Sequence, residues 1–128
     1  MKKIIFICLA MSAIVACKKK EEATPVATIT LITPTENQIF NAGDTLHVTG
    51  AISADGDMHG YSVKIQNLTS GETVLNQDYD LHQASFVINE SWKNTVTDTT
   101  QVKITIDAVL DHEGNLKTLD RIVTCYPQ

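Results

Sequence analysis

The chain has 128 residues, a length typical of one domain, and a formal net charge of -5. Half of its basic side chains, Lys2, Lys3 and residues 18–20, lie near the N-terminus, so the remainder is clearly acidic. An acidic domain without a basic stripe is a poor nucleic-acid binder, and no nucleic-acid partner is expected. Aromatic residues make up 5% of the chain, which argues against a carbohydrate platform of stacked rings.

The first 16 residues have the pattern of a secretory signal. Lys2 and Lys3 precede a continuous apolar run over residues 4–15. A membrane-spanning helix needs about 20 apolar residues, whereas this run has the length of a signal-peptide core. Ala16 supplies the small residue expected before a cleavage site. Residues 1–16 are therefore predicted to be removed.

The sequence around the cleavage site points to a lipid anchor. Ile14, Val15, Ala16 and Cys17 resemble a bacterial lipobox. The resemblance implies that Cys17 is lipidated and that the protein is held in the cell envelope, at the outer membrane, on its periplasmic side or at the cell surface. Several acyl chains would make the anchor effectively permanent. The alternative is an ordinary secreted protein with a chance cysteine.

Residues 17–26 are charged and poor in apolar side chains, so they are predicted to form a flexible tether after the lipidated cysteine. Cys8 leaves with the signal and Cys17 carries lipid, which leaves Cys125 alone in the folded part. Cys125 is predicted to be a small buried hydrophobic residue rather than a reactive thiol.

Short segments of alternating apolar and polar residues follow over residues 27–128. This alternation, typical of strands with one buried face, occurs at residues 28–32, 46–52, 61–66, 84–89 and 101–108. The polar run 74–79 is predicted to be an edge strand, and the glycine-containing segment 53–57 a loop. Residues 101–126 are predicted to form a hairpin with Ile104 and Ile106 buried. Together these elements predict an all-β fold, a single antiparallel β-sandwich of about seven strands.

Two sequence patterns point to a particular family of β-sandwiches. Pro34 and the pattern Phe40-x-x-Gly43-Asp44-x-Leu46-x-Val48-x-Gly50 resemble the opening of bacterial immunoglobulin-like (Ig-like) domains. More narrowly, the chain resembles small Bacteroidota lipoproteins with one Ig-like domain. The residues that carry this resemblance are His59-Gly60, His82, Trp92 and Asp111-His112-Glu113-Gly114-Asn115. It implies a fold and a pattern of site residues, and no reaction.

Three of the four histidines are predicted to lie at one end of the sandwich. Consecutive strands alternate in direction, so the connections that contain His59, His82 and His112 share an end, whereas His47 lies mid-strand on the polar face. Three imidazoles from separate loops suit zinc or copper. Asp57, Asp80, Asp111 and Glu113 lie beside them as further ligands or as acceptors that orient the rings. The plain alternative is that surface loops carry polar residues, histidine included.

Calcium is a weaker alternative. Asp55-Gly56-Asp57 and the alternate residues Asp111, Glu113 and Asn115 offer oxygen ligands, as calcium loops do. These are also ordinary turn residues.

The sequence therefore leaves two classes of function open. One is a membrane-anchored envelope lipoprotein that binds a transition metal. The other is a structural or protein-interaction module without a metal, with an envelope protein as partner, or a calcium-binding adhesion-type module. An enzyme is not expected, because the sequence has no Gly-x-Ser-x-Gly, P-loop, GxGxxG or HExxH motif. His112, between Asp111 and Glu113, resembles a general base without an accompanying nucleophile.

Overall fold

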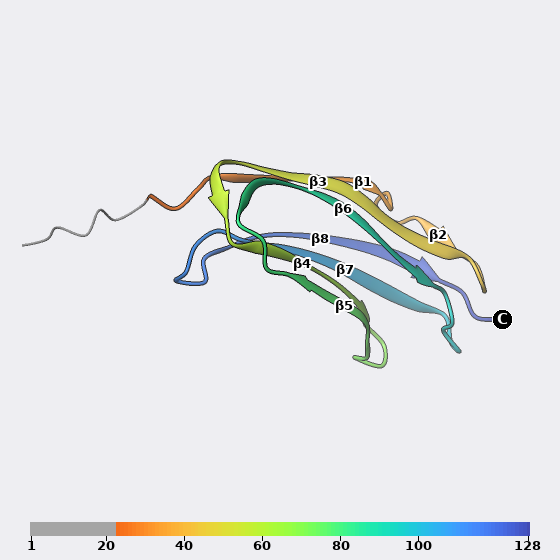
Figure 1. The fold of residues 1–128 in the computed structure, drawn as a ribbon. Coiled ribbons are helices and arrows are strands. Elements are labelled where there is room, and N and C mark those ends of the chain that lie inside the picture. The colour runs from red at the N-terminus through yellow and green to blue at the C-terminus, as the bar shows by residue number, and fades with distance from the viewer. Residues whose placement is uncertain (1–22) are drawn as a thin grey trace, which may run out of the picture.

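The computed structural model describes residues 23–128. Within them the chain forms eight strands and no helix (Figure 1): β1 (Ala27–Thr33), β2 (Ile39–Phe40), β3 (Thr45–Met58), β4 (Gly60–Asn67), β5 (Thr73–Tyr79), β6 (Gln83–Lys93), β7 (Thr100–Val109) and β8 (Leu116–Cys125). In this part of the chain no helix could cross a membrane. The predicted signal peptide, Cys17 and most of the predicted tether lie outside the described residues.

The strands form two facing sheets (Figure 1). One has the order β1-β3-β6 and the other β2-β8-β7-β4-β5. Each pairing is antiparallel except that of the two-residue β2 with β8, which is parallel. The predicted Ig-like β-sandwich is confirmed, and β5 lies at the edge of its sheet as expected.

The core lies between the two sheets. Ile104 and Ile106 of β7 are fully buried, as predicted, and so are Val48 of β3 and Val63 of β4. Ile106 pairs with Val63 across the β4–β7 ladder, and the partly buried Trp92 packs against the same core. The alternation read from the sequence thus places each apolar face inward.

Cys125 is also part of this core, with no exposed surface. Burial raises the pKa of its thiol to about 11. A thiol that stays protonated and inaccessible is a poor nucleophile, so the expectation of a small hydrophobic residue is confirmed.

The prediction of a loop over residues 53–57 is wrong. β3 continues through them to Met58, which is fully buried, and its register with β6 shifts between Ser53 and Met58. Asp and Gly residues gave a turn signal, but Asp55 donates its backbone N–H to the carbonyl of Val26. This pairing with a distant segment keeps the backbone extended, and the extra residues form an irregularity in the ladder.

The strand directions decide what lies at each end of the sandwich. The connections β3–β4, β5–β6 and β7–β8 lie at the end where β1 begins, and the C-terminus lies at the other (Figure 1). The first of these ends, called here the histidine end, contains His59, His82 and His112.

Candidate functional site

His59 is the single residue between β3 and β4. Its backbone N–H donates to the carbonyl of Val109 (2.8 Å), which ties this corner to the end of β7. The next residue, Gly60, has a φ of +144°, and a Cβ there would lie 2.0 Å from the carbonyl oxygen of Tyr79. Only glycine fits so close to the end of β5. Gly60 therefore brings the His59 corner against the connection that carries His82.

His112 lies in the tight turn between β7 and β8. Leu110 donates its N–H to the carbonyl of Asn115 (2.8 Å), and Gly114, with a φ of +84°, donates to the carbonyl of Asp111 (3.3 Å). The Asp111 carboxylate closes the turn further through hydrogen bonds to Glu113 and Asn115, and His112 lies within it. His82 lies in the short connection between β5 and β6 and is exposed.

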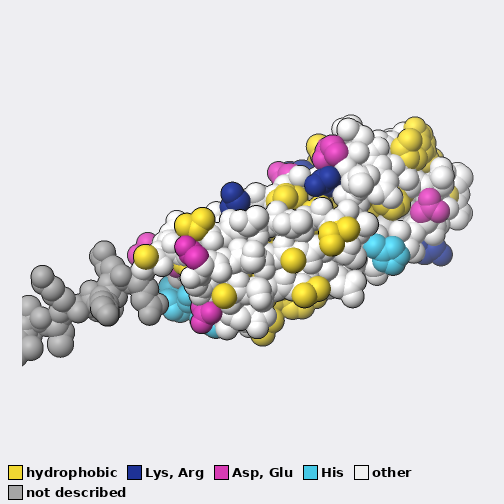
Figure 2. Space-filling view, turned by 90° about the horizontal axis from the view of Figure 1, so that it is seen from above, with side chains coloured by type: hydrophobic (Ala, Val, Ile, Leu, Met, Phe, Trp, Pro, Cys, Tyr) yellow, Lys and Arg dark blue, Asp and Glu magenta, His cyan; other side chains and the backbone are white. Residues whose placement is uncertain are grey.

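The three imidazole rings lie together. The ring centroids of His59 and His112 are 3.9 Å apart, those of His59 and His82 are 4.3 Å apart, and those of His82 and His112 are 6.1 Å apart. Figure 2 shows histidine side chains gathered at one end of the domain and a further histidine toward the other. His47 pairs with Ser91 within the β3–β6 ladder, outside this group. The convergence predicted from strand order is therefore present.

The three rings lie together, but their nitrogen atoms are not placed around one common position. The rings meet edge to face, and among residues 23–128 no group of three or more His, Cys, Asp or Glu side chains has ligand atoms placed to hold an ion. Two imidazoles on one tetrahedral zinc, at Zn–N distances of about 2.0–2.1 Å, have centroids roughly 5 Å apart. The separations of 3.9, 4.3 and 6.1 Å fall on both sides of that value. Ligation thus requires ring rotations and shifts on the order of 1 Å.

The four neighbouring carboxylates differ in what they contact. Asp80 lies 3.8 Å from Nε2 of His82, and both side chains are largely exposed. Asp57 and Glu113 are exposed, and each lies within two residues of a histidine of the group in the sequence. Asp111 instead accepts hydrogen bonds on both oxygens from its own turn and from Thr24. Those contacts, with that of Asn115 first, lower the pKa of Asp111 to about 2.

Asp111 is therefore a carboxylate that shapes the turn around His112, and its lone pairs are already used within the protein. Asp55, another residue of the calcium alternative, accepts the backbone N–H of Val26 at 2.7 Å. Both hydrogen-bond sets are those of structural acidic residues. No observation in the described part of the chain favours calcium over a transition metal.

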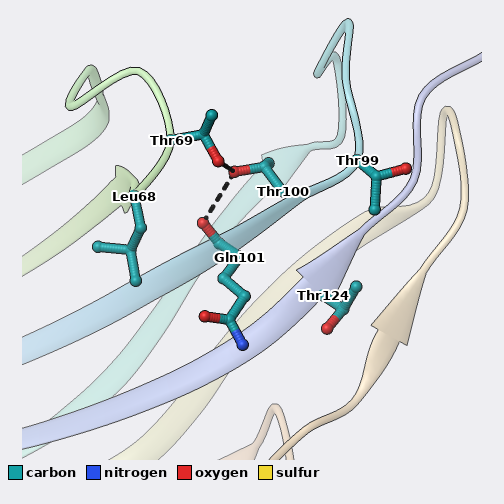
Figure 3. Close-up of a pocket in the computed structure, with 6 residues that line it drawn as sticks. All are labelled: Leu68, Thr69, Thr99, Thr100, Gln101 and Thr124. Atoms are coloured by element: carbon teal, nitrogen blue, oxygen red, sulfur yellow. Dashed lines mark hydrogen bonds between the residues drawn. The ribbon is translucent and has the colours of Figure 1, made fainter.

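A shallow hollow of 510 Å³ lies at the opposite end of the sandwich (Figure 3). It is lined by Leu68, Thr69, Thr99, Thr100, Gln101 and Thr124. The hydroxyl of Thr100 lies 2.7 Å from that of Thr69 and donates to Oδ1 of Asn67 at 2.9 Å. No charged side chain lines the hollow, and its most buried hydroxyl is satisfied internally, so the histidine end is the stronger candidate.

Comparisons with known proteins give little beyond this geometry. No protein-family model matches the chain, and no curated protein matches it. Among solved structures, the CARDB domain of a Pyrococcus furiosus protein, crystallised in complex with di-metal ions, is similar at 16% identity with a TM-score of 0.45. The match covers 78% of this chain and 89% of that one. A likeness at this level says nothing about what the present chain binds, and the di-metal ions belong to that domain.

Two features of the site had no usable signal in the sequence. Thr24 belongs to the segment predicted as a flexible tether, yet its hydroxyl donates to Oδ2 of Asp111 at 2.8 Å. Gly60 follows a histidine in the sequence pattern, but its close approach to Tyr79 depends on where β5 ends. Both contacts join segments far apart in the chain, and composition and periodicity do not report such contacts.

Proposed function

We propose that the chain is an envelope-anchored, Ig-like module that binds one transition-metal ion, zinc or copper, through His59, His82 and His112. The observation that carries the proposal is the packing of three imidazoles from three separate connections within 6.1 Å of one another. Neutral imidazole is a preferred ligand of both metals.

The composition of the cluster supports this function. Imidazole nitrogens are common ligands of both metals, and three rings from separate connections would bring such ligands to one ion. Binding requires the neutral form of each ring. Asp80 lies 3.8 Å from Nε2 of His82, close enough to reach that ring nitrogen or the ion after a small movement.

The exposure of the rings also supports the proposal. His82 and His112 are exposed and His59 is only partly buried, so their side chains can turn without disturbing the core. The sandwich has its own hydrophobic core, so the domain folds without an ion. A site on exposed loops suits reversible binding and exchange better than a structural metal.

The anchor is the second half of the proposal. The lipobox-like sequence ending in Cys17 supports attachment to the outer membrane, on its periplasmic side or at the cell surface. The chain's other expected partner, an envelope protein, would then meet the domain at that membrane.

The test is metal binding by tag-free protein. Titration calorimetry with zinc and, separately, copper(II) should show one ion per chain. His59→Ala, His82→Ala and His112→Ala should each weaken binding by at least about 10-fold. His47→Ala is the matched control and should leave the affinity unchanged. Binding that survives the three substitutions, or that is lost in the control, would contradict the site.

A protein-interaction module without a metal is the second candidate. β6 forms an edge of the three-stranded sheet, and its outward-facing Val87 is 78% exposed. An edge strand with an exposed apolar residue suits addition of a partner's strand. Val87→Lys should then abolish a complex with an envelope protein, whereas loss of the histidines should leave the complex intact.

A further inference from the structure

Residues 24–26, called here the N-terminal strap, contact the last part of β3, which leads to His59, and the β7–β8 turn that carries His112. Val26 donates its N–H to Oδ1 of Asp55 (2.7 Å) and accepts the N–H of Asp55 (3.3 Å). A Cβ on Gly56 would lie 3.6 Å from the ring of Pro25, so the proline packs over that glycine. These contacts attach the strap to the end of β3, just before His59.

The other attachment is to the turn of His112. The hydroxyl of Thr24 donates to Oδ2 of Asp111 at 2.8 Å. The strap therefore joins the last part of β3, a few residues before His59, to the β7–β8 turn of His112. The ring centroids of these two histidines are 3.9 Å apart.

Asp111 connects the strap to the histidine turn. Its Oδ1 accepts the backbone N–H groups of Glu113 (3.0 Å) and Asn115 (3.1 Å), and its Oδ2 accepts the side-chain amide of Asn115 (2.7 Å). The hydrogen bond from Thr24 goes to the same Oδ2. His112 lies inside the loop that these bonds close. Any shift of Asp111 therefore moves the backbone that presents the imidazole.

We infer that the strap and the metal site are linked, with Asp111 as the positioning residue through which docking of the strap fixes His112 for metal binding. This inference rests on the function proposed above. Linkage is reciprocal, so a bound ion holds the strap on the domain to the same extent that a docked strap strengthens binding. A force or partner that pulls the strap off the domain therefore favours release of the ion.

The position of the strap matters as well. β1 begins where the strap ends, at the histidine end (Figure 1). The strap thus lies at the same end of the sandwich as the proposed metal ligands. A force on the strap, or a partner that binds it, would therefore act at the same end of the domain as the metal site.

The experiment measures both sides of the linkage in the full chain. Thr24→Val removes the hydroxyl donor and keeps the shape of the side chain, and it should weaken zinc binding on the order of 5-fold. Thr24→Ser keeps the donor and should restore the wild-type Kd. Thr28→Val, at an exposed position on β1, is the matched control and should bind zinc as the wild type does.

The second readout is hydrogen exchange at the amide of Val26, which reports strap docking directly. Zinc should slow that exchange in the wild type, and the slowing should be smaller in Thr24→Val. An equal Kd for both proteins, or exchange at Val26 that zinc leaves unchanged, would overturn the linkage and leave the metal site standing. A wild-type chain that binds neither zinc nor copper would overturn both.

Discussion

The phenol of Tyr79 donates a hydrogen bond to the carboxylate of Glu90, which joins β5 at the edge of one sheet to β6 at the edge of the other. Tyr79 also stacks on Tyr61 of β4, with ring centroids 4.6 Å apart, and Tyr61 donates to the carbonyl of Val87 on β6. Because β5 and β6 flank the connection that carries His82, the two tyrosines tie together the strands on either side of it.

Replacement of Tyr79 by Phe should change how stability depends on alkaline pH. The hydrogen bond to Glu90, followed by burial, raises the pKa of Tyr79 to about 12. The folded state thus holds the phenolic proton more tightly than the unfolded state, where the pKa is about 10. The contribution is fully present below about pH 10 and is lost as pH rises toward 12.

Tyr79→Phe should therefore lower the free energy of unfolding by about 1 kcal/mol at neutral pH and flatten its fall between about pH 10 and 12. Urea unfolding at a series of pH values measures both effects. Tyr126→Phe, at an exposed position, is the control and should leave the profile as it is. An unchanged alkaline slope in Tyr79→Phe would show that the contact with Glu90 is absent in solution.

Truncation of Ile104 should be costly. Its side chain is fully buried at the centre of β7, so Ile104→Ala should destabilise the domain by about 2–5 kcal/mol. Val87→Ala, at a position that is 78% exposed, should stay within about 0.5 kcal/mol of the wild type. Denaturant unfolding of Ile104→Ala, with Val87→Ala on β6 as the exposed control, tests the register of the hairpin, because a shift by one residue would expose Ile104.

The fold was predictable because a period of two survives in each long strand. Val102, Ile104 and Ile106 alternate with polar residues, and the structure buries all three. The segment at Asp55 was not predictable in the same way. Asp and Gly residues favour a turn locally, but hydrogen bonds to Val26 and the pairing of Ala54 with Ala27 keep it extended. Local propensity gives way there to pairing with a distant segment.

The site was predictable only to the level of strand order. The alternation of strand directions placed His59, His82 and His112 at one end, and the rings are there. Strand order carries no information about side-chain torsions, so it does not specify that the rings meet edge to face. Strand order also does not predict the contact between Thr24 and Asp111, because the segment of Thr24 has no periodic pattern that would place it on the domain.

Lipid attachment through Cys17 is a prediction independent of the fold. Cys17→Ala should leave the protein unprocessed or soluble, because the residue that carries the acyl chains and marks the cleavage site is gone. Detergent phase partitioning and the mass of the mature chain measure this. Cys125→Ala is the matched control, since that thiol is buried in the core, and should leave anchoring intact. A Cys17→Ala protein that still partitions with detergent at the mature mass would contradict the anchor.

Addition of a single methyl group at Gly60 should damage the histidine end more than any exposed substitution there. The new Cβ would lie 2.0 Å from the carbonyl oxygen of Tyr79 and 3.1 Å from its carbon, and the φ of +144° is itself unfavourable for alanine. The obstructing atoms belong to the backbone of β5, so no side-chain rotation relieves the clash. Gly60→Ala should cost roughly 3 kcal/mol or more in unfolding free energy.

Gly71→Ala separates this clash from backbone strain alone. Gly71 also has a positive φ, +75°, but nothing lies within 4 Å of a Cβ there, so the substitution should cost only about 1–2 kcal/mol. The difference between the two variants in urea unfolding measures the close approach of the His59 corner to β5. If Gly60→Ala were no worse than Gly71→Ala, the corner could not be pressed against Tyr79. The 4.3 Å separation of the His59 and His82 rings would then lose its structural basis.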